Sequence, residues 1–165
     1  MKITRKQLRK LIKETTEPAV FSREFYTPEK FKGFRPVSNE GRIHVKPAGL
    51  WYSCNEEWKN WVMYEMPQWW ESYNFKYNIN VDLSKMLVIR TEEEFLAFEK
   101  EYVFGNKLKA IDWERVANRY AGIEICPYQY RMRGGHKWYR PWDIGSGCIW
   151  DPSAFVSVEE VYPFR

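Results

Sequence analysis

The sequence predicts a single α+β domain with a largely antiparallel or mixed sheet and flanking helices, on the basis of three observations. The length of 165 residues fits one domain. Segments of strand and helix character follow one another without the regular strand–helix alternation of a parallel α/β fold. Nine tryptophans, an unusually high number, lie in or near short aromatic motifs, so large rings either pack a small core or form stacking surfaces for planar ligands. We expect the domain to span residues 18–165, after a tail at residues 1–17.

The composition is that of an ordinary globular chain. Hydrophobic residues make up 44% and charged residues 29%. No apolar run approaches the roughly 20 residues of a membrane span, and the basic N-terminus lacks the apolar segment of a secretory signal. An odd number of cysteines at wide spacing argues against a disulfide framework and favours a reducing, intracellular compartment. These cysteines are Cys54, Cys126 and Cys148.

The positive charge of the chain is concentrated in its tail. The net charge is +4, and residues 1–14 hold six cations against one acid, so the rest of the chain is nearly neutral. A capping box of Thr4 and Gln7 begins a short basic amphipathic helix over residues 4–14. This helix is either solvated or frayed, or it docks onto an acidic partner, a membrane surface or nucleic acid.

Two strands and a short helix are expected at the start of the domain. Apolar and β-branched residues predict strands at 20–23 and 50–53. The chain between them is rich in turn formers, and Thr27 followed by Pro28 predicts a short helix with proline at its first position.

A longer helix is expected after the second strand. Ser53 or Asn55 can cap it, and Pro67 should kink or end it. Its apolar face carries Trp58, Trp61 and Val62.

Five further strands complete the sheet. Alternation predicts a strand at 77–83, and an apolar run predicts a buried strand at 86–89. Shorter apolar segments predict strands at 123–125, 148–150 and 155–162.

Two helices between these strands are bounded by capping residues. Thr91 and Glu94 form a second capping box, and that helix should end at the Gly-Asn pair 105–106. Asp112 is expected to cap a third helix, which Gly122 should end.

Several catalytic templates are excluded. The chain has no Walker A sequence, no Gly-x-Gly-x-x-Gly and no Gly-x-Ser-x-Gly. Gly145-Ser146-Gly147 is typical of a turn. His44 and His136 lack metal-type spacing to any cysteine, so no metal site is predicted, and a zinc site from the three cysteines and one histidine is the weaker alternative.

The segment between Glu124 and Asp143 contains no acid and mixes cations with aromatic rings. Because cations hold phosphates and aromatic faces stack bases, this loop, residues 127–142, either binds a nucleotide or nucleic-acid strand or is a solvated hairpin whose rings pack on the domain. Its cations are Arg131, Arg133, His136, Lys137 and Arg140. Its rings are Tyr128, Tyr130, Trp138, Tyr139 and Trp142.

Glu124 is a candidate catalytic acid. It lies between Ile123 and Ile125, so its side chain points to the opposite face of the strand from theirs. That face is either solvent or the floor of a cleft, where one carboxylate can stabilise an oxocarbenium ion or act as a base.

Three motifs resemble a family of small bacteriophage proteins over roughly residues 20–155. The resemblance implies a protein of the host cytoplasm or of the virion. The basic N-terminal start is similar to leaders on marine phage proteins. The motifs are Lys46-Pro47-x-Gly49-Leu50-Trp51-x-Ser53, Ile111-Asp112-Trp113-x-x-Val116-x-x-x-Tyr120-x-Gly122-Ile123 and Trp138-Tyr139-x-x-Trp142-Asp143-x-x-Ser146-Gly147-Cys148-Ile149-Trp150.

A second resemblance is to the ADP-ribosyltransferases. It is carried by Arg23 on the first strand, by the segment 49–53 with its aromatic helix, and by Glu124 on a later strand. The chain departs from the family in lacking a His-Gly-Thr, a Ser-Thr-Ser and a Glu-x-Glu or Gln-x-Glu pair, so Asp143 competes with Glu124 for the role of the acid.

The resemblance implies a split sheet, NAD as the cofactor and a role for each matching residue. Arg23 would hold the pyrophosphate or ribose, Ser53 would order the site, and Glu124 would stabilise the oxocarbenium-like transition state. The cofactor-binding set would be Trp51, Tyr52, Trp58 and Asp143, with Trp51 or Tyr52 stacked on the nicotinamide. The acceptor, a host protein or nucleic acid, would contact Arg131, Arg133, Lys137 and Arg140.

The leading expectation is therefore transfer of ADP-ribose from NAD to a macromolecule. One alternative is a non-enzymatic, virion-associated or host-interaction module, docked to a larger phage assembly by residues 4–14. The other alternative is a nucleic-acid-binding module that uses loop 127–142.

Overall fold

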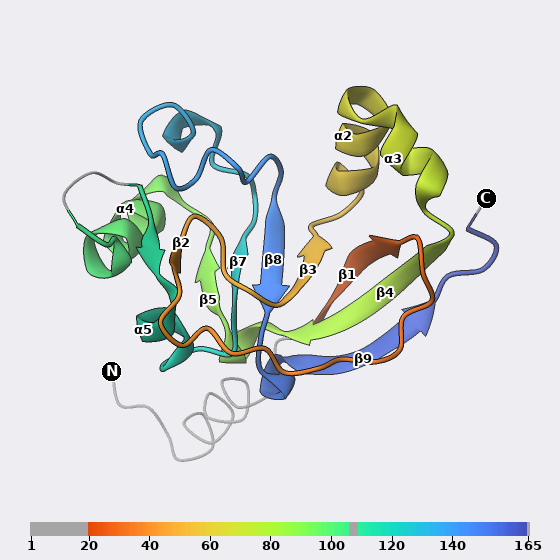
Figure 1. Ribbon diagram of the computed structural model, residues 1–165, viewed down its shortest axis with the longest axis horizontal. Helices are drawn as coiled ribbons and strands as arrows, with labels where there is room; N and C mark the ends of the chain where they lie inside the picture. Colours follow the sequence, from red (N-terminus) through yellow and green to blue (C-terminus); the bar gives the residue numbers. More distant parts are fainter. Residues whose placement is uncertain (1–19, 106–108, 165) are drawn as a thin grey trace, which may run out of the picture.

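A seven-stranded mixed sheet forms the centre of the molecule (Figure 1). This computed structural model describes residues 20–105 and 109–164, and the helix expected over residues 4–14 lies outside them. The strand order is β5-β7-β8-β3-β1-β4-β9, in which β5 and β7 are parallel and the other neighbours antiparallel. The strands are β1 (Val20–Thr27), β3 (Leu50–Ser53), β4 (Phe75–Asp82), β5 (Leu87–Ile89), β7 (Gly122–Ile125), β8 (Ser146–Ile149) and β9 (Phe155–Glu160). The predicted α+β fold is confirmed.

The two halves of the sheet meet at a narrow junction. β1 pairs with β4 along its whole length, but it pairs with β3 at a single position, where Glu24 lies opposite Ser53. The sheet is continuous, and its β5-β7-β8-β3 half and β1-β4-β9 half separate beyond that pair. The candidate site described below lies at this junction.

Helices flank both halves of the sheet. Figure 1 shows α4 and α5 beside the β5 edge, whereas α2 and α3 stand near the ends of β3 and β1. The helices are α2 (Glu57–Glu65), α3 (Pro67–Ser72), α4 (Glu92–Tyr102) and α5 (Trp113–Ala117). Short 3-10 helices are η1 (Leu83–Lys85), η2 (Tyr130–Met132) and η3 (Pro152–Ala154). A small second sheet, which the sequence did not predict, pairs β2 (Ile43–His44) with β6 (Ile111–Asp112).

Tryptophan rings build the larger of two hydrophobic clusters, one on each face of the sheet. Trp113, Trp138, Trp142 and Trp150 are almost fully buried there. Each indole N–H still donates a hydrogen bond, which is the condition for burying tryptophan at low cost. The acceptors are the main-chain oxygens of His44, Val45 and Tyr120 and the carboxylate of Glu99. These four rings therefore pack the core, which is one of the two roles that the sequence predicted for the tryptophans.

Most predicted elements are confirmed, because their signals are local. The strands at 20–23, 50–53, 77–83, 86–89, 123–125, 148–150 and 155–162 all appear within a few residues of their expected bounds. The capping box of Thr91 and Glu94 is formed, and the Asp112 side chain accepts from the Arg115 N–H. α2 ends at Glu65, and Pro67 is the first residue of α3.

Four predicted details are wrong. α4 ends at Tyr102 and not at the pair 105–106, because Val103 is extended and bridges to Ile111. No helix follows Thr27, since its hydroxyl accepts from the Glu29 N–H in a turn and Phe31 packs on Tyr77 with ring centroids 5.8 Å apart. Gly122 begins β7 and does not end α5, because a side chain at this position would clash with the main chain of β8.

The fourth detail is the cap of α2. The Ser53 hydroxyl donates to the Asn55 carbonyl, and Asn55 adopts a positive φ of 58°. Neither side chain reaches the helix N-terminus, where Glu56 occupies the cap position without a side-chain hydrogen bond. The predicted capping by Ser53 or Asn55 is therefore wrong.

Candidate functional site

A pocket of about 200 Å³ opens at the junction of the two half-sheets. Its walls come from β1, β3, the first turn of α2 and the segment that precedes β8. The lining includes Glu24, Tyr26, Lys46, Trp51, Tyr52, Ser53, Trp58, Trp142, Asp143 and Ser146. The loop 127–142 and the α2–α3 pair extend beyond the same end of the sheet (Figure 1).

Five residues that the sequence nominated line this pocket together: Trp51, Tyr52, Ser53, Trp58 and Asp143. Trp51 and Ser53 face it from alternate positions of β3. Trp58 reaches it from α2, which follows β3 directly, and Asp143 comes from the segment before β8. Three parts of the chain thus supply one cavity.

The aromatic wall has both a stacked and an edge-on arrangement. Trp51 meets the edge of Trp142 with ring centroids 4.9 Å apart, and the Lys46 ammonium lies 5.0 Å from the Trp51 centroid. Trp58 stacks on Trp61 at 5.2 Å. Aromatic rings held by neighbours in this way present pre-organised surfaces to a planar ligand.

Charged groups of both signs surround the rings. The Glu24 carboxylate accepts from Lys76 at 2.5 Å and from the Tyr26 hydroxyl at 2.8 Å. The Asp143 carboxylate pairs with the Arg133 guanidinium at 3.2 Å, and the Asp143 side chain is 29% exposed. Burial lowers the pKa of Lys46, and the nearby Asp143 carboxylate partly offsets that effect. The pocket lining thus contains two carboxylates, each paired with a cation from outside the lining, and the Lys46 ammonium.

Hydrogen bonds join the segment before β8 to α2 and to the residue that follows β3. The Gly145 N–H donates to the Glu57 carboxylate at 2.7 Å, and the Cys54 N–H donates to the Gly145 carbonyl at 3.0 Å. Burial raises the pKa of Glu57, and the hydrogen bond from Gly145 lowers it. A Cβ at Gly145 would press on the Glu57 carboxylate, so glycine permits this close approach.

A buried ion pair lies on the opposite face of the sheet. Arg23 donates to both carboxylate oxygens of Glu124 at 2.8 Å, and the Tyr52 hydroxyl donates to one of them at 2.8 Å. The Glu124 side chain is only 2% exposed and that of Arg23 14%. Bidentate contacts of this kind are among the strongest side-chain hydrogen bonds in proteins.

Strand register explains how this network forms. Glu124 on β7 and Tyr52 on β3 both lie opposite Gly147 of the intervening strand β8. Because Gly147 has no side chain, the Tyr52 ring lies across it and reaches Glu124. The hydrogen bond to Glu124 raises the pKa of Arg23, and burial with the negative charge of Glu124 raises the pKa of Tyr52 well above its ordinary value.

The structure thus divides the nominated residues between two faces. Arg23, Tyr52 and Glu124 come together, but their polar groups lie across the sheet from Trp51, Ser53 and the rest of the pocket wall. Tyr52 contributes to the pocket lining, while its hydroxyl is committed to Glu124 on the other face.

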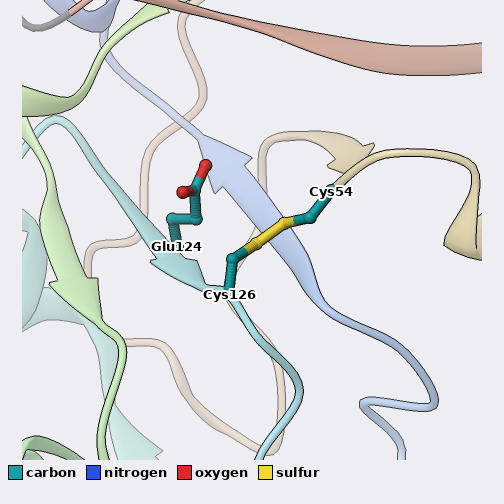
Figure 2. Close-up of side chains that lie close together, drawn as sticks. All are labelled: Cys54, Glu124 and Cys126. Atoms are coloured by element: carbon teal, nitrogen blue, oxygen red, sulfur yellow. A yellow bond between two sulfur atoms is a disulfide. The ribbon is translucent and has the colours of Figure 1, made fainter.

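The cysteines contradict the prediction that the chain has no disulfide. Cys54 and Cys126 form one, and Figure 2 shows it crossing β8 beside Glu124. The two residues follow β3 and β7, whose ends converge where β8 begins, and a sequence separation of 72 residues concealed this proximity. Cys148 is buried on the other face, and burial raises its thiol pKa, so the three cysteines do not form one site. The argument for a reducing compartment therefore loses its basis.

Loop 127–142 separates its rings from its cations. Tyr128, Trp138, Tyr139 and Trp142 are buried, so these rings pack on the domain as one of the two interpretations expected. Tyr130 remains 78% exposed. The four nominated cations, Arg131, Arg133, Lys137 and Arg140, are exposed. Arg133 links this basic surface to the pocket through Asp143.

The pocket residues that sequence reasoning missed include three polar ones, Glu24, Tyr26 and Lys46. Alternation along β1 was the available signal for two of them, since Glu24 and Tyr26 face away from Arg23. Lys46 belongs to a motif that was quoted for its resemblance, without a role for the lysine.

Comparison with known proteins adds no assignment: no protein-family model, curated protein or solved structure matches the chain. The resemblances to phage proteins and to ADP-ribosyltransferases stay predictions. Within residues 20–105 and 109–164, no helix has the length and apolar character needed to cross a membrane.

Proposed function

We propose that the pocket binds the nicotinamide end of NAD and that the protein transfers ADP-ribose to a macromolecular acceptor. The observation that carries the proposal is the meeting of Trp51, Ser53, Trp58 and Asp143 in one cavity. The resemblance to ADP-ribosyltransferases implies roles in NAD binding or catalysis for the same residues.

The dimensions and charges of the pocket support this ligand class. A volume of about 200 Å³ accommodates one planar ring with part of its substituent, and it is smaller than the pockets that enclose a whole drug-sized ligand. The ring would lie against Trp58 or Trp51. The pyrophosphate would extend outward toward Lys46 and Arg133, whose charges suit phosphate oxygens.

The reaction needs a carboxylate that faces the breaking bond. As the glycosidic bond between ribose C1′ and the nicotinamide nitrogen breaks, its electron pair leaves with nicotinamide, and positive charge develops on the ribose. In our proposal Asp143 stabilises that charge, because it lines the pocket and is accessible, whereas Glu124 is buried across the sheet with both oxygens engaged. An acceptor nucleophile then bonds to C1′ and releases a proton.

In this scheme Arg23 and Glu124 act structurally. Their pairing holds β1 to β7, and thereby fixes the junction at which the pocket opens. The exposed cations Arg131, Lys137 and Arg140 would contact the acceptor. The loop that carries them adjoins the pocket, because its Arg133 pairs with Asp143 of the pocket lining.

Calorimetric titration with NAD tests the binding step. Trp58→Ala should weaken NAD binding about tenfold or more, because stacking on an aromatic ring contributes roughly 1–3 kcal/mol per base. The matched control is Trp69→Ala on α3, which removes an indole that is 45% exposed and lies outside the pocket lining. The proposal fails if the wild-type protein does not bind NAD, or if the two variants weaken it equally.

A further inference from the structure

The Cys54–Cys126 disulfide joins two strands that are not neighbours. β8 lies between β3 and β7, and the disulfide passes across it with the two Cα atoms 6.4 Å apart (Figure 2). Cys54 directly follows Ser53, and its N–H is bonded to Gly145 of the segment that leads into β8. The cross-link therefore lies beside Glu124, on the opposite face of the sheet from the pocket, and adjoins the pocket lining through Ser53.

The two cysteine residues differ in exposure. Cys54 is only 3% exposed, whereas Cys126 is partly exposed. Thiol–disulfide exchange requires an in-line approach of a thiolate to one sulfur, and access decides which sulfur is attacked. An external thiol can approach Cys126, and Cys54 is then the leaving group.

A buried carboxylate accompanies the pair. One oxygen of Glu124 and both sulfur atoms lie within 4.8 Å of one another. The negative charge of a neighbouring carboxylate disfavours a thiolate, so it favours the disulfide over two ionised thiols. The Arg23 and Tyr52 contacts hold that carboxylate in place in either state.

The same three residues resemble a partial metal site, but their contacts favour the redox interpretation. Both oxygens of Glu124 already accept hydrogen bonds, and the sulfur atoms are joined to each other. Within the described part of the chain the group contains no fourth ligand. A structural zinc site requires four.

We propose that Cys54 and Cys126 form a redox-active disulfide that exchanges with an external dithiol and thereby controls the pocket. A thiolate of the dithiol attacks Cys126 Sγ, the sulfur–sulfur bond breaks, and Cys54 leaves as a thiolate that takes up a proton. The second thiol of the reagent then attacks the mixed disulfide, its sulfur bonds to the first, and Cys126 leaves and is protonated. The protein gains two electrons and two protons, and the dithiol becomes a disulfide.

Reduction releases the end of β3 from the end of β7. Ser53 and the segment that carries Asp143 and Ser146 are the pocket residues nearest to that end, so reduction should change the affinity of the pocket for its ligand. This consequence rests on the proposed function, whereas the exchange reaction itself does not.

The test equilibrates the folded, full-length protein in buffers of graded reduced-to-oxidised dithiothreitol ratio. Rapid alkylation and intact-mass measurement then count the free thiols. We expect one transition in which two thiols appear together. The transition should be absent in the double variant Cys54→Ser/Cys126→Ser and present in the Cys148→Ser variant. NAD affinity should differ at least several-fold between the two ends of the transition, and the double variant should match the reduced protein.

Two results would overturn the exchange proposal. One is a pair that stays oxidised in excess dithiothreitol while the protein is folded. The other is a pair that is reduced throughout and carries one equivalent of zinc by elemental analysis, which would make it a metal site. Reversible exchange with equal NAD affinity in both states would overturn the control of the pocket. Failure of both states to bind NAD while exchange occurs would instead refute the proposed function.

Discussion

At the scale of single residues, Gly147 determines how the buried network is built. It lies on β8 between Tyr52 of β3 and Glu124 of β7, and the tyrosine ring fills the space above it. The network would be impossible with any side chain at this position unless Tyr52 moved. A glycine that the sequence shows only as part of a Gly-Ser-Gly turn is thus a packing residue.

Gly147→Ala should destabilise the fold by about 1–3 kcal/mol or more, because the added methyl group overlaps the Tyr52 ring. The measurement is the free energy of unfolding in urea. Gly134→Ala is the control, since a Cβ there meets no atom within 4 Å. Equal stability of the two variants would show that the ring does not occupy this place.

Lys46 gives the pocket a pH dependence. Burial lowers its pKa below the ordinary 10.5, so this lysine loses its charge at a lower pH than an exposed one. Binding of ADP-ribose should therefore be strongest near neutral pH and should weaken about tenfold or more as the pH rises toward 10.5, because a charge-assisted hydrogen bond is lost. Titration at several pH values measures this. Lys46→Arg, which keeps its charge, should abolish the dependence, and an unchanged profile in that variant would contradict the assignment.

At the scale of elements, α4 begins with the capping box that its sequence predicts. The Thr91 hydroxyl accepts from the Glu94 N–H, and the Glu94 carboxylate accepts from the Thr91 N–H. Thr91→Ala should lower the free energy of unfolding by about 1 kcal/mol. Thr91→Ser retains the hydroxyl and should stay near the wild type. Chemical denaturation compares the three proteins, and an equal loss in the serine variant would exclude capping as the cause.

Elements of this kind were predictable, because caps and alternation act over a few residues. The helix expected after Thr27 failed, since Phe31 and Phe34 are drawn onto the sheet by Tyr77 and Phe155. The β2–β6 pair was missed, because two-residue strands carry no periodic signal. In both segments, contacts between residues distant in the sequence determine the structure.

At the scale of the whole molecule, the sequence nominated residues that lie together in two groups, but it did not show that the groups lie on opposite faces of the sheet. Arg23 and Glu124 did meet, as did Trp51 and Trp58. Alternation assigns the side chains of a strand to two faces, yet the location of the cavity depends on how α2 and loop 127–142 pack around the end of the sheet. The disulfide depends on the same convergence of strand ends, and for that reason it was predicted wrongly.

The central claim is that catalysis belongs to the pocket face of the sheet. The most direct measurement is nicotinamide release from NAD by wild-type protein, Asp143→Asn and Glu124→Gln, each verified as folded by circular dichroism at the assay temperature. We predict release by the wild type, a loss of about a hundredfold or more in Asp143→Asn, as is typical for removal of a group that stabilises transition-state charge, and near wild-type release in Glu124→Gln. Loss of release in folded Glu124→Gln with retention in Asp143→Asn, or no release by the wild type, would contradict the account.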